Sequence, residues 1–409
     1  MTGPAAPGAM KLASRLEHIE PFYVMECAKA AGELADSPAC DPRVGGRPML
    51  FLNIGEPDFT APPLVQQAAE RALRDGRTQY TDATGLPELR ERLSAWYAQR
   101  FGLDIAPRRI VITAGASAAL QLACLALVDR DDEVLLPDPS YPCNRHFVAA
   151  AEGVPVLLPA SAEARFQLDA RSVEAAWTPR TRGVLLASPS NPTGTSIDPD
   201  EMGRIAAAVR ARGGFTLVDE IYLGLSFDER YGHSALAHGQ GHGDDVISIN
   251  SFSKYFSMTG WRLGWLVAPD ALVPAIEKLA QNLYICPSTV AQYAALACFE
   301  PESIAEYERR RAAFRARRDF LVPALGALGL PVPVQPDGAF YAWADCSAHF
   351  STSCANSWDF TFDVMRRAHV AITPGRDFGR HATERFVRLS YASSMARLQE
   401  AVERLRLAL

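Results

Sequence analysis

Lysine is scarce in this chain of 409 residues. Of the 41 lysines and arginines only four are lysines, so the remaining 37 are arginines. The four are Lys11, Lys29, Lys254 and Lys278. We attribute most of this bias to the base composition of the genome, yet Lys254 lies in the middle of a segment rich in serine and aromatic residues. That lysine is therefore the first candidate for a chemical role.

The sequence also lacks features typical of membrane proteins, nucleic-acid-binding proteins and secreted proteins. No long uninterrupted apolar run occurs, so no transmembrane helix is expected. The net charge is −6 and there is no block of basic residues, which argues against nucleic acid and membrane surfaces as partners. The first residues lack the apolar core of a signal peptide. We therefore expect a cytoplasmic protein with a flexible N-terminal tail over residues 1–20.

The cysteines and histidines indicate neither disulfides nor a metal site. None of the eight cysteines belongs to a C-x-x-C pair, and Cys124 and Cys298 lie in alanine- and leucine-rich segments typical of buried helices. Reduced, structural thiols are expected. The spacing of His233, His238 and His242 fits no metal-ligand scheme, and their glycine-rich surroundings are typical of a solvated loop. The sequence therefore predicts no metal.

The middle of the chain alternates short β-branched runs with helical stretches. Nearly continuous apolar content, typical of strands covered on both faces, occurs in residues 109–113, 133–136, 154–158, 183–187, 215–218, 246–250 and 262–267. Helical patterns lie between several of these runs, for example over residues 117–127 and 200–211. This alternation predicts an α/β fold in which helices wrap a mostly parallel, seven-stranded sheet.

The chain changes character beyond about residue 300. A charged amphipathic helix is expected over residues 302–321, with Pro323 as its stop. Strand patterns over 339–343 and 386–391 and a terminal helix from Met395 follow, and they indicate a smaller α+β domain. The predicted domains are a large α/β domain and a small α+β domain, over residues 61–295 and over residues 21–60 with 296–409.

Polar and reactive residues follow four of the predicted strands. Ligands of open α/β sheets bind beyond the carboxyl ends of the strands, so these residues are expected to meet at one edge. In chain order they are Gly115, Ala116 and Ser117; Asn191; Asp219 and Tyr222; and Ser251, Ser253, Lys254 and Arg262. Their convergence is a stronger signal than any one of them.

The first and last of these groups suit a phosphate. The turn at residues 115–117 opens a helix and offers its free backbone N–H groups to an anion, although the same turn also begins many ordinary helices. Ser251, Ser253 and Arg262 would complete the phosphate site, with Arg262 making a two-pronged contact.

The remaining groups suit a pyridine ring and an aldehyde. Asp219 could keep a pyridinium nitrogen protonated, or it could merely cap a helix. Tyr222 and Asn191 could hydrogen-bond a ring hydroxyl, although an Asn-Pro-Thr-Gly segment is also a common turn. Lys254 could form a Schiff base if burial lowers the pKa of its amine, whereas a lone lysine is ordinarily a solvated surface group. Together the groups fit pyridoxal phosphate held on Lys254.

Residues 251–264 resemble the lysine signature of the class I/II aminotransferases, which are pyridoxal-phosphate enzymes of fold type I in the aspartate aminotransferase superfamily. Their sequence is Ser-Phe-Ser-Lys-Tyr-Phe-Ser-Met-Thr-Gly-Trp-Arg-Leu-Gly. The Asn-Pro-Thr-Gly at 191–194 and the pair Asp219 and Tyr222 precede it in the family's order, and the resemblance runs from about residue 21 to the C-terminus. It implies an enzyme that moves an amino group from an L-amino acid to a 2-oxo acid in a ping-pong reaction.

The resemblance also implies roles for individual residues around the cofactor. Lys254 would carry it as a Schiff base, and Lys254, Asp219 and Tyr222 would be the catalytic residues. Tyr141 would stack on the pyridine ring. Tyr80 would reach the cofactor phosphate of a neighbouring subunit, so a homodimer is expected.

Three residues would bind the substrate: by resemblance, Gly55 and Asn191 lie near its carboxylate and Arg388 grips it. No second cation is identified for a side-chain carboxylate, so the amino donor is left open. Aromatic candidates for an apolar side-chain pocket, which could equally belong to the core, are Phe22, Tyr23, Tyr255 and Phe256.

Two other functions stay open on the same fold, since a fold does not decide a reaction. One is elimination or a related reaction, as in C–S β-lyases, which would release pyruvate and ammonia without an oxo-acid acceptor. The other is a sensor that binds pyridoxal phosphate without turnover. The resemblance begins after only about 20 residues, which leaves no room ahead of it for a winged-helix DNA-binding domain.

Overall fold

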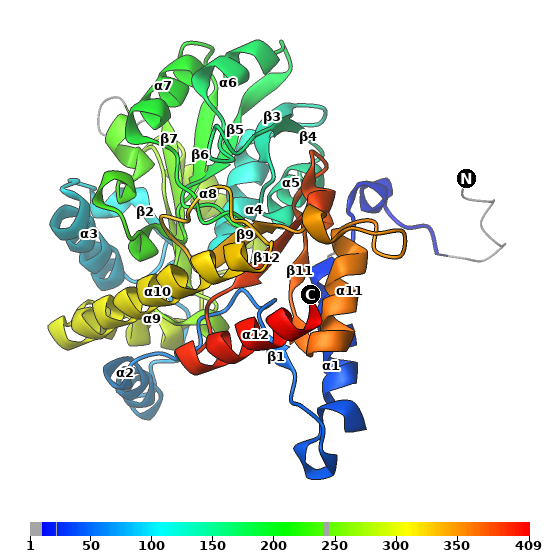
Figure 1. Ribbon diagram of the computed structural model, residues 1–409. Coiled ribbons are helices and arrows are strands. Elements are labelled where there is room, and N and C mark those ends of the chain that lie inside the picture. The colour runs from blue at the N-terminus through cyan, green and yellow to red at the C-terminus, as the bar shows by residue number, and fades with distance from the viewer. Residues whose placement is uncertain (1–9, 22, 240–244) are drawn as a thin grey trace.

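The computed structural model describes residues 10–21, 23–239 and 245–409. These residues form one sheet of seven strands and two small sheets of two and three strands. Figure 1 shows the large sheet in the upper part of the molecule, the helices α1 (Tyr23–Ala35) and α12 (Met395–Ala408) in the lower part, and the long helix α10 (Pro301–Ala327) between them.

The large sheet has the strand order β2-β8-β7-β6-β5-β3-β4. β8 is antiparallel to β2 and β7, and every other pair is parallel. The strands are β2 (Ile110–Thr113), β3 (Glu133–Asp138), β4 (Val154–Pro159), β5 (Thr181–Ala187), β6 (Phe215–Asp219), β7 (Val246–Ser251) and β8 (Gly264–Val267). The predicted seven-stranded, mostly parallel sheet is confirmed. β2, β5, β6 and β7 point the same way, so their carboxyl ends lie at one edge.

Helices cover both faces of this sheet, which explains why its strands are apolar throughout. On β2, Ile110 and Ile112 pack in the apolar cluster that includes α3 and α7, whereas Val111 packs with α4 and α8. The helices of this part of the chain are α2 (Pro63–Arg74), α3 (Pro87–Phe101), α4 (Ala116–Leu127), α5 (Pro142–Ala150), α6 (Ala170–Ala176), α7 (Pro199–Arg210), α8 (Val273–Leu283) and α9 (Thr289–Leu296).

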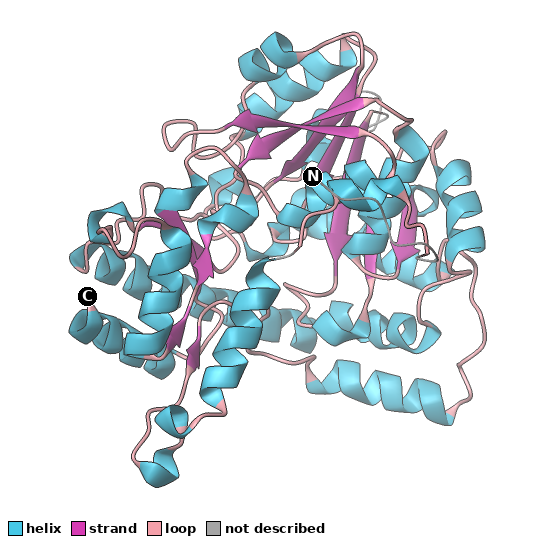
Figure 2. Cartoon of the chain, turned by 90° about the vertical axis from the view of Figure 1, so that its right-hand side faces the viewer, coloured by secondary structure: helices cyan, strands magenta, loops and turns pink. Residues whose placement is uncertain are grey.

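The segments before and after the large sheet meet in a smaller α+β part, and Figure 2 shows its strands apart from those of the large sheet. Parallel strands β1 and β10 form one small sheet, and β11, β12 and β9 form an antiparallel one. The elements are α1 (Tyr23–Ala35), β1 (Leu50–Phe51), α10 (Pro301–Ala327), β9 (Tyr341–Asp345), α11 (Ser357–Ala368), β10 (Val370–Ala371), β11 (Thr373–Pro374), β12 (Phe386–Ser390) and α12 (Met395–Ala408). One apolar cluster continues from the large sheet through α10 into β9 and β12, so the domain boundaries stay predictions.

The segment predicted as an N-terminal tail is described from residue 10 onward. Ser14–His18 form a 3-10 helix. Glu20 forms ion pairs with Arg145 (3.2 Å) and Arg380 (3.1 Å). Residues 1–9 lie outside the described residues, as do Phe22 and His242.

The described residues contain no group of three or more His, Cys, Asp or Glu side chains that could hold a metal ion. All eight cysteines are free thiols, and Cys124 and Cys298 are buried. None of the described helices is long and apolar enough to cross a membrane.

Helix α10 continues past Pro323, so the prediction that this proline ends the helix is wrong. Leu321 and Leu325, on either side of it, are fully buried in the main apolar cluster. Their packing holds this turn in the helical conformation although Pro323 has no N–H to donate. Tertiary contacts therefore outweigh a local breaker at this position.

We expect Pro323→Ala to raise the free energy of unfolding by about 1–3 kcal/mol, because alanine restores a backbone hydrogen bond and removes the clash of the ring with the preceding turn. Urea denaturation followed by tryptophan fluorescence measures this change. Pro301→Ala is the matched control, since Pro301 is the first residue of the same helix, where a proline costs little. Equal stability of the two variants would contradict the explanation given for Pro323.

Candidate active site

A cavity of about 610 Å³ lies at the carboxyl edge of the large sheet, where the small part of the protein meets it. Most of the residues predicted for the site line this cavity: Gly55, Ala116, Ser117, Tyr141, Asn191, Asp219, Tyr222, Ser251, Ser253, Lys254, Arg262 and Arg388. Gly115 lies directly beside it, and Tyr80 does not line it. Tertiary structure thus brings together residues from segments far apart in the sequence.

One end of the cavity suits an anion. Gly115 precedes α4 with a φ of 87°, a conformation that favours glycine, and a Cβ atom there would lie 2.6 Å from Nη2 of Arg262. The first N–H groups of α4 have no partner within the helix and carry the positive end of its dipole. The hydroxyl groups of Ser251 and Ser253, which hydrogen-bond each other at 2.9 Å, line the same cavity. These donors can surround a phosphate.

Asp219, at the end of β6, is a buried carboxyl group. It accepts one hydrogen bond, from the backbone N–H of Ile221 at 3.2 Å, and forms no ion pair with the described residues. Burial raises the pKa of Asp219 to about 7, while the Ile221 hydrogen bond and the charge of Lys254 act in the opposite direction. A cationic ring nitrogen placed here would supply the partner that this carboxylate needs.

Lys254 lies in the turn after β7. Its amine donates a hydrogen bond to the carbonyl oxygen of Gly55 at 2.5 Å. Burial lowers the pKa of the amine to about 8; the carboxylate of Glu56 opposes this shift, and the charge of Arg388 adds to it. A useful fraction of the amine is therefore unprotonated near neutral pH, as a nucleophile or a general base requires.

Arg388, on β12, is a buried cation. It donates from Nη1 to Oδ1 of Asn191 (2.9 Å) and from Nη2 to the carbonyl oxygen of Asn53 (2.8 Å). Its side chain is 4% exposed, its Nε has no hydrogen-bond partner, and it forms no ion pair with the described residues. A buried charge without a counter-ion is costly. The guanidinium group is therefore suited to bind an incoming carboxylate.

Tyr341 is a site residue that the sequence analysis treated only as part of a strand. Its hydroxyl hydrogen-bonds that of Tyr222 at 2.8 Å, and its ring centre lies 4.5 Å from the guanidinium carbon of Arg388. A Cβ atom on Gly55 would lie 2.5 Å from the same hydroxyl, which explains the glycine. Nothing in the local sequence distinguishes this tyrosine from a core residue.

Asn53 and the helix α1 also contribute residues that the sequence analysis missed. The Asn53 side chain is buried beside the cavity and has no hydrogen-bond partner among the described residues. Val24, Met25 and Ala28 of α1 also line the cavity. The amphipathic pattern of α1 is also typical of an ordinary surface helix, so it carried no signal of this role.

Of the four aromatic candidates for a side-chain pocket, the three that the structure describes do not line the cavity. Tyr255 and Phe256 are buried in an aromatic cluster with Tyr307, so they belong to the core. Tyr23 packs edge-to-face against Trp358 (5.9 Å between ring centres). Phe22, the fourth candidate, lies outside the described residues.

The donors and acceptors of the cavity fit pyridoxal phosphate. Groups that can bind a phosphate lie at one end of the cavity. The buried carboxyl group of Asp219, which forms no ion pair with the described residues, and the amine of Lys254, whose pKa is lowered, line the same cavity. A family model described as aminotransferase class I and II matches residues 47–405. The chain belongs to this family. Its members depend on pyridoxal phosphate, so this protein is a pyridoxal-phosphate-dependent aminotransferase.

Relatives of this aminotransferase match it over nearly its whole length. The valine–pyruvate aminotransferase of Mycobacterium tuberculosis is 37% identical over 387 residues, which cover 95% of this chain and 96% of that protein. The aspartate aminotransferase of Geobacillus stearothermophilus is 33% identical over 398 residues, covering 97% and 98%.

Solved structures agree with the fold type I assignment. An aminotransferase from Mycobacterium tuberculosis superimposes with a TM-score of 0.90 at 36% identity, covering 98% of this chain and 99% of that chain. The aspartate aminotransferase of Thermus thermophilus with maleate has a TM-score of 0.88 at 32% identity, covering 98% and 100%.

The lowered pKa of Lys254 is directly measurable in the cofactor-free protein. Competitive labelling with acetic anhydride, between about pH 6 and pH 10, should give half-maximal reactivity of Lys254 near pH 8, because the unprotonated amine is the reactive form. Mass spectrometry of the digest reports each lysine separately, and the exposed Lys29 and Lys278 serve as internal references. If the reactivity of Lys254 rose in parallel with that of the references over the whole range, the lowered pKa would be refuted.

Proposed function

We propose that this aminotransferase binds pyridoxal phosphate covalently through Lys254 and transfers an amino group from an L-amino acid to a 2-oxo acid in two half-reactions. The observation that carries the proposal is Arg388, a buried guanidinium group that forms no ion pair with the described residues, in the same cavity as Lys254 and Asp219. Both substrates carry an α-carboxylate, so one arginine can serve both halves of a ping-pong reaction.

The cofactor would be held by groups on four strand ends. The N-terminus of α4 at residues 115–117, together with Ser251, Ser253 and Arg262, would bind the phosphate. When bound, the cofactor supplies an electron sink for the electrons released at the substrate α-carbon.

Four side chains would orient and tune the ring. Asp219 would keep the ring nitrogen protonated, because a carboxylate held in a buried site favours a cation beside it. Asn191 and Tyr222 would hydrogen-bond the ring hydroxyl group, and Tyr141 would cover one face of the ring.

Lys254 would move the proton in the reaction. With cofactor and substrate bound, its amine would lie beside the substrate α-carbon, because Lys254 lines the same cavity as Arg388. An amine whose pKa lies near neutrality can take a proton from that carbon and give it back at another position. Arg388, held by Asn191 and by the carbonyl of Asn53, would fix the carboxylate and thereby the orientation of the α-hydrogen.

The enzyme would act as a homodimer in the cytoplasm. Tyr80 is 78% exposed, and an exposed tyrosine on a loop beside the sheet is available to reach the phosphate site of a second subunit. Eight free cysteines support a reducing compartment.

The half-reaction tests this proposal. The absorbance band of the protein–cofactor complex should shift when a single reactive amino acid is added, with one equivalent of the matching 2-oxo acid formed. Lys254→Ala should lower this rate by at least about 10⁴-fold, since it removes the covalent link and the general base. Lys278→Ala, an exposed lysine outside the cavity, is the matched control. Release of pyruvate and ammonia without an acceptor would instead indicate elimination.

Arg388→Lys should lower kcat/KM about 10- to 100-fold for every amino donor, because lysine keeps the charge but loses the two-pronged contact with the carboxylate. Steady-state kinetics on several donors and on a 2-oxo acid measure the effect. Arg397→Lys, on the exposed side of α12, should leave kcat/KM unchanged. A loss confined to one donor would contradict a role at the α-carboxylate that all donors share.

A further inference from the structure

We infer that the amino donor of this enzyme carries an uncharged, apolar side chain, which packs against Met25 and Ile54, and that Glu56 disfavours donors with a side-chain carboxylate. The inference rests on the proposed function and names the substrate class of the same cavity. It follows from an apolar wall, from the charges that line the cavity, and from how that wall is held.

Four apolar side chains from outside the large sheet line the cavity, and we call them the apolar wall. Val24, Met25 and Ala28 come from α1, and Ile54 comes from the segment after β1. Met25 is 61% exposed and Ile54 is 47% exposed, although both line the same cavity. Large apolar side chains left open at a site favour an apolar group that covers them, because contact removes their surface from water.

Each lysine and arginine side chain that lines the described cavity already binds a group of the cofactor or of the substrate in the proposed reaction. Lys254, Arg262 and Arg388 are the only lysines and arginines of the described residues that line it. In the proposed function they meet the cofactor's aldehyde, its phosphate and the α-carboxylate. No cation of the described cavity is left for a second carboxylate, and burying one without a partner is costly.

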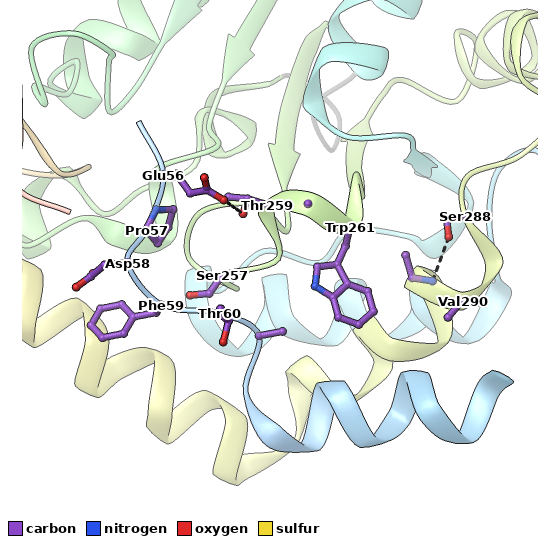
Figure 3. Close-up of a pocket in the computed structure, with 13 residues that line it drawn as sticks. Glu56, Pro57, Asp58, Phe59, Thr60, Ser257, Thr259, Trp261, Ser288 and Val290 are labelled. Atoms are coloured by element: carbon purple, nitrogen blue, oxygen red, sulfur yellow. Dashed lines mark hydrogen bonds between the residues drawn. The ribbon is translucent and has the colours of Figure 1, made fainter. Parts of the chain in front are cut away.

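Glu56 is the charged group that the proposed reaction does not use. It follows Gly55, whose carbonyl oxygen accepts the hydrogen bond from Lys254, so it lies beside the reacting amine. It also lines a neighbouring cavity of about 520 Å³, and Figure 3 shows its carboxylate hydrogen-bonded to the hydroxyl of Thr259 at the border of the two cavities. A side-chain carboxylate brought here would meet a like charge.

The apolar wall is held in place by a buried acid of the small domain. Asp377 is fully buried, and its carboxylate accepts hydrogen bonds from the backbone N–H groups of Tyr23 (3.1 Å) and Val24 (2.9 Å) at the start of α1. An acid at a helix N-terminus satisfies N–H groups that have no partner within the helix. The first turn of α1, which presents Val24 and Met25 to the cavity, is therefore fixed to the site.

Two measurements on the cofactor-loaded enzyme test the inference. The first compares kcat/KM for leucine, methionine, alanine, aspartate and glutamate, and we expect leucine or methionine to exceed both acidic donors by at least about tenfold. The second uses titration calorimetry with two unreactive acids. We expect 4-methylpentanoate to bind at least about tenfold more tightly than glutarate. Because neither acid reacts, this comparison measures the preference of the cavity for an apolar side chain independently of turnover.

Single substitutions distinguish the effect of the apolar wall on donor preference from the effect of the charge of Glu56. Met25→Ala should lower kcat/KM for leucine and methionine about tenfold and change it little for alanine, whose side chain is too short to use the wall. Glu56→Gln should raise kcat/KM for aspartate and glutamate relative to leucine, because it removes the like charge. Glu33→Gln is the matched control, since Glu33 is an exposed acid of α1 outside the cavity, and it should leave the ratio unchanged.

Three results would overturn the inference. A wild-type preference for aspartate or glutamate over leucine would show that a cation reaches the site from elsewhere. An equal loss for all donors in Met25→Ala, or a weakened dimer by sedimentation with unchanged donor ratios, would show that Met25 covers something other than the substrate. Absence of the half-reaction with every donor would instead refute the proposed function itself, whereas the three results above would leave it standing.

Discussion

The buried guanidinium group of Arg388 is the interaction on which the geometry of the site depends. It comes from β12 of the three-stranded sheet, yet it donates hydrogen bonds to Asn191, which follows β5 of the large sheet, and to the backbone of Asn53 near the N-terminus. Three segments far apart in the sequence thus meet at one side chain. Because it forms no ion pair with a carboxylate of the described residues, the same side chain that joins these segments is also free to bind a ligand carboxylate.

Burial also determines the protonation of the two groups nearest the reacting atoms. It lowers the pKa of Lys254 to about 8 and raises that of Asp219 to about 7, so both lie close to neutrality in the absence of a ligand. The pKa values of the two groups shift in opposite directions for the same reason, because loss of hydration disfavours the charged form of an acid and of an amine alike. Burial of these two side chains therefore provides both a general base and a partner for the ring nitrogen.

The sequence predicted the seven strands and the candidate cofactor-binding residues at their ends, because both signals are local. Apolar runs mark the strands, and short motifs directly after these runs mark the binding residues. It did not predict the course of α10, since the packing of Leu321 and Leu325 outweighs the proline between them. It did not decide whether Tyr255 and Phe256 line a substrate pocket or pack in the hydrophobic core, because an apolar sequence pattern is the same in both cases. Tyr341 was missed for the same reason.

The sequence by itself determined the fold class, the family and the residues that suit pyridoxal phosphate, because these depend on periodicity and on motifs contiguous in the chain. The tertiary structure alone decided that Arg388 forms no ion pair with the described residues, that Tyr341 contacts Gly55, Tyr222 and Arg388, and that Met25 of α1 lines the cavity. Such facts depend on contacts between residues hundreds of positions apart, and burial and charge balance exist only once those contacts have formed.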